Sequence, residues 1–148
     1  MLKWLKSIIE YFRYYYEEPP RETIFVESYF VTIEFDIQRG GSLCVYLDNE
    51  EIAKADMHFE IRKAELKRIK VNEEYRLKGI GSLVIDIILK WCKEHQIKKV
   101  KVYPSSYTSE ELFEKGFTKA LPQKHLIAFY KKCGFTEEKG DYLYANIG

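Results

Sequence analysis

The stretch from 64 to 92 constrains the fold more than any other part of the chain. It predicts a short strand over 66–71, a polar bend over 72–78 and a helix that begins at the glycines Gly79 and Gly81. The helix is indicated by one face of apolar residues at helical spacing: Ile80, Leu83, Val84, Ile87, Ile88 and Trp91. A strand that leads through a glycine loop into a helix is expected to form an anion site. The first helical turn carries unpaired N–H groups and the positive end of the helix dipole.

Two common phosphate-binding loops do not match this segment. A P-loop needs Gly-x-x-x-x-Gly-Lys-Ser/Thr, which the chain lacks. A dinucleotide fingerprint needs a third glycine, and Val84 occupies that position. The chain instead has Arg76-x-x-Gly79-x-Gly81 directly after a strand, with Lys78 adding a second positive charge. The pattern therefore predicts a phosphate site of a different kind.

Residues 75–82, Tyr-Arg-Leu-Lys-Gly-Ile-Gly-Ser, resemble the pyrophosphate loop of the GNAT superfamily of acyl-CoA-dependent N-acyltransferases. Residues 129–135 resemble the later family motif aromatic-Tyr-x-Lys-x-Gly-Phe. Both motifs stand in the family's order, and the resemblance covers about 64–147. It implies an α+β fold with a mixed, mostly antiparallel central sheet flanked by helices. We expect one such domain over 1–148.

The resemblance implies acetyl-CoA as co-substrate and assigns residues to it. The pyrophosphate would bind the loop residues Arg76, Leu77, Lys78, Gly79, Ile80, Gly81 and Ser82. The pantetheine arm would pair with the backbone of Ile69, Lys70 and Val71, where an N–H group would also polarise the thioester carbonyl. Gln123 stands where the family often has an asparagine that contacts the cofactor.

Two residues are candidates for proton transfer. Tyr130 matches the family's tyrosine that protonates the leaving thiolate. The alternative role for Tyr130 is that of an aromatic residue packed on the sheet, a role that suits Phe129 and Phe135 better. Glu65 matches a glutamate that some members use as general base, and the period-two rule places it on one strand face with Ile69. The alternative is an ordinary exposed glutamate.

The rest of the chain predicts an antiparallel sheet with additions. A helix over 1–16 ends at Pro19-Pro20, and an insertion is expected over 107–122. Further elements are strands over 23–38, 42–47, 51–62 and 98–103, a helix over 123–133, and a hairpin of 135–138 with 142–147. Family members usually place one or two helices between the first and second strands, where this chain has only Gly40-Gly41. The acceptor therefore stays open: a small amine, an amino acid, a peptide N-terminus or a protein lysine.

Composition excludes several classes. The net charge of +1 offers no bulk attraction for nucleic acid, and no apolar run reaches the ~18 residues of a membrane span. The three cysteines, Cys44, Cys92 and Cys133, lie in apolar patterns and predict reduced core thiols of a cytoplasmic protein. The three histidines, His58, His95 and His125, show no metal-ligand spacing, so no metal is predicted.

The sequence thus predicts an acetyl-CoA-dependent N-acetyltransferase that acts on a primary amine by direct transfer in a ternary complex. Direct transfer is expected because no cysteine occupies a motif position suited to a covalent acyl-enzyme. The alternative is a non-catalytic GNAT-fold module that binds acyl-CoA or a partner. The broad apolar face of the N-terminal helix could also support a homodimer.

Overall fold

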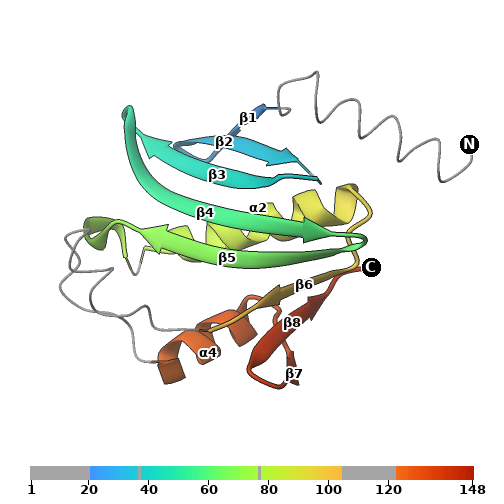
Figure 1. Ribbon diagram of the computed structural model, residues 1–148. Helices are drawn as coiled ribbons and strands as arrows, with labels where there is room; N and C mark the ends of the chain where they lie inside the picture. The colour runs from blue at the N-terminus through green and yellow to red at the C-terminus, as the bar shows by residue number, and fades with distance from the viewer. Residues whose placement is uncertain (1–20, 37, 77, 105–122) are drawn as a thin grey trace, which may run out of the picture.

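The computed structural model describes residues 21–36, 38–76, 78–104 and 123–148. Its eight strands form one sheet in the order β1-β2-β3-β4-β5-β6-β8-β7, and only the β5–β6 pair is parallel (Figure 1). The strands are β1 (Glu22–Val26), β2 (Tyr29–Asp36), β3 (Gly40–Leu47), β4 (Glu50–Glu60), β5 (Lys63–Val71), β6 (Lys99–Val102), β7 (Glu137–Lys139) and β8 (Tyr142–Asn146). The helices are η1 (Glu73–Tyr75), α2 (Ile80–Glu94) and α4 (Gln123–Lys132). The predicted mixed, mostly antiparallel sheet flanked by helices is confirmed. The predicted helix over 1–16 and the insertion over 107–122 lie outside the described residues.

The prediction of a single strand over 23–38 is wrong. β1 and β2 form an antiparallel hairpin, with Val26 paired to Tyr29 across a two-residue turn. Glu27 adopts a left-handed conformation there, with φ of 55°. No glycine or asparagine marks this turn, so the local residue types gave no signal for it. Because the chain folds back, the backbone N–H and C=O groups of β1 form ladder hydrogen bonds with β2. A single extended strand would have left these groups unpaired.

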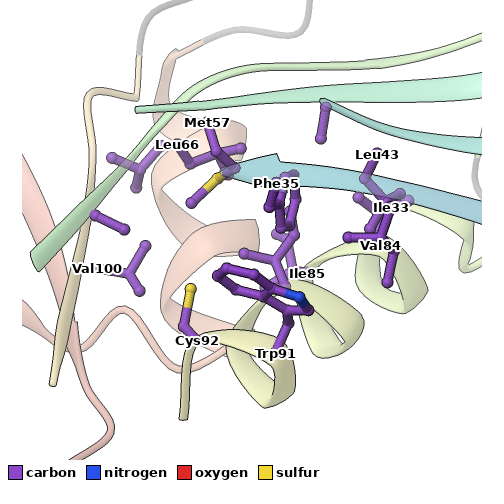
Figure 2. Packing of buried hydrophobic residues seen from close by; sticks show 14 of the residues in the cluster. Ile33, Phe35, Leu43, Met57, Leu66, Val84, Ile85, Trp91, Cys92 and Val100 are labelled. Atoms are coloured by element: carbon purple, nitrogen blue, oxygen red, sulfur yellow. The ribbon is translucent and has the colours of Figure 1, made fainter. Parts of the chain in front are cut away.

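One face of the sheet is apolar and carries the core (Figure 2). α2 lies against this face and buries a stripe of side chains onto it: Ile80, Val84, Ile85, Ile88, Trp91 and Cys92. Trp91 meets the sheet with its ring centroid 5.0 Å from that of Phe35 and 5.4 Å from that of Phe59. The buried stripe differs slightly from the predicted one, because Ile85 is buried whereas Leu83 and Ile87 are half-buried.

α4 lies beside α2 on the same face. A Cβ atom on Gly81 would come within 3.1 Å of Phe129 Cζ, and Cys133 Sγ lies 3.9 Å from Ser82 Oγ. α4 and the segment after it also contribute Tyr130 and Phe135 to the core. Because both helices pack on one face, the other face is formed by the alternate side chains of the strands. We call it the polar face.

A β-bulge in β5 decides which β5 side chains reach the polar face. Met57 pairs with Leu66 and Asp56 with Arg68, so Lys67 is an extra residue in β5. The extra residue reverses the alternation, and the core-facing side chains are Ala64, Leu66, Ile69 and Val71. The prediction that Glu65 shares a face with Ile69 is therefore wrong: Glu65 lies on the polar face.

Candidate active site

The loop between β5 and α2 leaves backbone donors exposed at a helix start. Gly79 is the N-cap of α2 and is left-handed, with φ of 80° and ψ of 7°, and no side chain caps the helix. The first intrahelical bond runs from the N–H of Leu83 to the carbonyl of Gly79 at 3.0 Å. The N–H groups of the preceding turn, Ile80 to Ser82, therefore lack an intrahelical acceptor. A Cβ atom at Gly79 would meet nothing within 4 Å, so there is open space beside this turn.

The two glycines of the loop serve different purposes. Gly79 allows the positive φ, which side-chain-bearing residues rarely adopt. Gly81 is needed because Phe129 packs onto the first turn of α2, where a Cβ atom would stand 3.1 Å from Cζ of its ring. Sequence reasoning assigned both glycines to the anion site. The packing requirement at Gly81 depends on α4 and could not be seen along the chain.

Positive side chains lie near the same loop. Arg76 has an extended backbone, and its Nε donates a hydrogen bond to the carbonyl of Val71 at 3.3 Å. This bond brings the guanidinium back to the end of β5. Lys78 is exposed, with its Nζ 5.5 Å from the centroid of the Tyr75 ring. Leu77, the other predicted loop residue, lies outside the described residues.

The second half of β5 has a free edge toward β6. β5 and β6 pair only from Lys63 with Lys99 to Leu66 with Val102. Beyond this point no described strand pairs with that edge of β5, while Ile69, Lys70 and Val71 remain paired with β4 on the other edge. The predicted pantetheine-binding residues therefore lie on a strand that can still accept an added extended chain on one side.

Tyr130 is held in the core at the end of α4. Only 6% of its surface is exposed, and its ring lies edge-on to Phe135, with centroids 5.7 Å apart. Its carbonyl accepts hydrogen bonds from the N–H groups of Cys133 and Phe135 at 3.1 Å and 3.0 Å. Gln123 is exposed at the first position of α4. The helix thus orients Tyr130 inward and leaves Gln123 at the surface.

Glu65 lies within a group of polar side chains that sequence reasoning did not assemble. It is in register with His58 on β4 and with Lys101 on β6. Its side chain is 13% exposed, and its Oε2 lies 3.4 Å from Lys67 Nζ. The polar alternation Lys54, Asp56, His58, Glu60 along β4 was a signal that could have indicated this face.

The three thiols are held neutral by their surroundings. Burial raises the pKa of Cys92 to about 12. Burial, followed by the nearby Glu51 carboxylate, raises the pKa of Cys44 to about 11. Burial also raises the pKa of Cys133, against a smaller opposing effect of the Ser82 hydroxyl. A neutral thiol is a weak nucleophile, so none of the three is prepared to carry an acyl group.

The described part of the chain contains neither a metal-binding cluster nor a membrane-crossing helix. Within residues 21–36, 38–76, 78–104 and 123–148, no group of three or more His, Cys, Asp or Glu side chains could hold a metal ion. Over the same ranges no helix has both the length and the hydropathy for a membrane crossing.

The fold and loop define an α+β protein whose sheet carries one parallel strand pair and whose main helix begins at a glycine loop. The acetyltransferase (GNAT) family matches residues 3–135, so the chain belongs to this family. A comparison with curated proteins gives no match.

Solved structures give the same fold. The PaiA N-acetyltransferase from Thermoplasma acidophilum, in complex with coenzyme A, is 23% identical with a TM-score of 0.54, and the match covers 71% of this chain and 59% of that one. The Bacillus subtilis acetyltransferase in complex with CoA is 14% identical with a TM-score of 0.54, over 76% of this chain and 80% of that one. At these identities the likeness establishes the fold alone. The predicted family and fold are confirmed.

Proposed function

We propose that this protein is an N-acetyltransferase that moves an acetyl group from acetyl-CoA to a primary amine by direct transfer. The observation that carries the proposal is the continuity between the free edge of β5 and the uncapped first turn of α2. The N–H groups of Ile80, Gly81 and Ser82 would bind the pyrophosphate, and Gly79 provides the open space beside them. The backbone of Ile69, Lys70 and Val71 would bind the extended pantetheine arm, and Gln123 is a further contact candidate.

The chain's own residues supply the groups that the transfer needs. The amine nitrogen bonds to the thioester carbonyl carbon as the carbon–sulfur bond breaks, so the amine loses a proton and the thiolate gains one. In our proposal a backbone N–H of β5 polarises the carbonyl, Tyr130 protonates the thiolate and Glu65 accepts the amine proton. The neutral state of all three cysteines supports direct transfer over an acyl-enzyme.

A thermal-stability measurement tests cofactor binding at the loop. Acetyl-CoA at about 100 times its dissociation constant should add ~2.7 kcal/mol to the free energy of unfolding and raise the melting temperature. Gly79→Glu should abolish the rise, because a carboxylate would occupy the phosphate position. Gly140→Glu is the matched control. Gly140 also has a positive φ, of 63°, and a Cβ atom there would meet nothing within 4 Å, but it lies in the β7–β8 turn.

The control separates cofactor binding from backbone strain. Both substitutions place a side chain at a positive φ, so both variants should melt at lower temperature than the wild type without ligand. Only Gly79→Glu should lose the response to acetyl-CoA. A folded wild type that shows no rise at saturating acetyl-CoA would contradict the proposal.

A Tyr130→Phe variant tests the proton donor. Phenylalanine keeps the buried ring and removes only the hydroxyl, so the affinity for acetyl-CoA should stay the same while kcat falls by ~10²–10⁴-fold. Tyr29→Phe, on half-buried Tyr29 of β2, is the control that should keep full activity. Unchanged kcat in Tyr130→Phe would remove Tyr130 from the mechanism.

The alternative function is a non-catalytic module that binds acyl-CoA or a partner. The tight connection between β2 (ending at Asp36) and β3 (beginning at Gly40) favours it, because no helix stands between these strands to help hold an acceptor. Acetyl-CoA binding without turnover of any amine by the wild type would support this alternative.

A further inference from the structure

The polar face of the sheet carries a hollow around Glu65. Cross-strand pairing sets His58, Glu65, Lys101 and Tyr144 side by side on β4, β5, β6 and β8. A neighbouring row sets Glu60, Lys63 and Lys99 beside them. Between the rows lies a cavity of about 90 Å³, lined by His58, Glu60, Lys63, Ala64, Glu65, Lys99, Lys101 and Tyr144. The cavity is large enough for a few non-hydrogen atoms of a ligand, and all of its lining residues except Ala64 carry a polar group.

Positive charge dominates the polar face along β5 and β6. The basic side chains of these two strands are Lys63, Lys67, Arg68, Lys70, Lys99 and Lys101, and Glu65 is their one acidic side chain. On the neighbouring β4, Lys54 alternates with Asp56 and Glu60. The chain as a whole has a net charge of only +1, whereas these two strands together carry six basic side chains against one acidic one.

The lysines of the hollow differ in their partners. Lys99 lies 3.8 Å from Glu137, and the Glu65 carboxylate is engaged by Lys67 at 3.4 Å. Among the described residues, Lys63 and Lys101 form no ion pair within 4.0 Å, and the ammonium of Lys101 is 4.9 Å from the centroid of the Tyr142 ring. Two cations of the hollow therefore form no ion pair with a described carboxylate, although Glu60 and Glu65 lie on the strands beside them, and they remain able to bind an anion.

The hollow adjoins the point where the proposed reaction would occur. The β5–β6 pairing ends at Leu66 with Val102, one residue beyond Glu65 and Lys101, and the free edge of β5 begins there. α2 and α4 cover the opposite face at this position. An acceptor that reaches a thioester on the β5 edge would therefore approach from the polar face.

We propose that the hollow binds the acceptor, and that the acceptor is an amine that also carries a carboxylate or phosphate group, bound by Lys63 and Lys101. The inference rests on the proposed acetyltransferase function. The anionic group accounts for the cations without carboxylate partners, and the same cations disfavour the charged ammonium form of the amine. A lower amine pKa helps to produce the neutral nucleophile that the transfer needs. The attraction is partly exposed to solvent, so it should weaken as salt is added.

The test uses matched pairs of amines with acetyl-CoA as donor. One pair is 4-aminobutanoate and its amide, and the other is phosphoethanolamine and ethanolamine. The wild type should favour the anionic member of at least one pair by about tenfold in kcat/KM, the size expected for a charged hydrogen bond. The pair with the larger preference identifies the anion as carboxylate or phosphate. The preference should largely disappear in a Lys63→Gln, Lys101→Gln double variant, while the KM for acetyl-CoA stays the same.

The control variant is Lys93→Gln, which removes an exposed cation in the last turn of α2 and should keep the preference. If no amine is acetylated, NMR is used instead to measure the equilibrium binding of the same four amines to the CoA-saturated protein. Tighter binding of an anionic amine to the wild type, lost in the double variant, supports the inference. Equal binding, no binding or a preference that survives in the double variant overturns it.

The melting experiment with acetyl-CoA distinguishes a failure of the acceptor assignment from a failure of the proposed acetyltransferase function. A protein that is stabilised by acetyl-CoA and acetylates neutral amines as well as anionic ones would retain the proposed function and lose the acceptor assignment. A folded protein that acetyl-CoA does not stabilise would lose the proposed function, and the assignment with it.

Discussion

At the scale of single residues, burial determines the chemical state of the three thiols. Cys92 is fully buried on the inner face of α2, and its pKa is raised to about 12. Cys44 is half-buried on β3, with its pKa raised to about 11, and the pKa of Cys133 is shifted in the same direction. A raised thiol pKa means that the neutral form persists at every pH below it. At pH 8 each cysteine is therefore protonated and poorly nucleophilic.

We accordingly expect slow alkylation of the folded protein. With iodoacetamide at pH 8, Cys44 and Cys92 should react at least about tenfold more slowly than in the urea-unfolded chain, because only the thiolate reacts. Intact-mass measurements over time would show this difference. Rapid labelling of either cysteine in the native protein would contradict the assigned state and reopen the acyl-enzyme route.

At the scale of elements, β5 brings the candidate site together. Its first half pairs with β6 and presents Glu65 to the polar face, and its second half has a free edge beside the glycine loop. The extra residue Lys67 separates the two halves and allows Leu66 and Ile69 both to reach the core. Regular alternation would have turned one of the two away, since a one-residue slip moves a strand's side chains to the opposite face.

Deletion of Lys67 should keep the apolar side chains of β5 on the core face and should be tolerated. Without the extra residue, Leu66 is followed directly by Arg68, and regular alternation leaves Leu66 and Ile69 both facing the core, at an expected loss of no more than ~3 kcal/mol. Lys67→Ala, which keeps the bulge, should cost within ~1 kcal/mol, because the ion pair of Lys67 with Glu65 is partly exposed. Urea unfolding of both variants measures the difference. A loss of more than ~4 kcal/mol on deletion would contradict this expectation and show that β5 needs the bulge itself.

At the scale of the whole molecule, the sheet divides the protein into two chemically different sides. The core, with α2 and α4, occupies one face (Figure 1), and the basic hollow lies on the other. The parallel β5–β6 pair is part of the sheet that separates these two sides. Its pairing is short and ends at Leu66. Cofactor elements and acceptor elements of the proposed site thus meet at the end of this pair, which joins segments on either side of α2.

Residue patterns over short stretches of the chain were sufficient to predict the strand–loop–helix unit, the family and most strands. Helical spacing and glycine positions act over a few residues, so α2 and the loop at Gly79 could be recognised without partners. The hairpin turn at Glu27 and the bulge at Lys67 could not be recognised in this way, because strand register depends on which strands pair with each other. The same reason explains why the hollow was missed: Lys101 is far along the chain from His58 and Glu65, and only strand pairing places the three side by side.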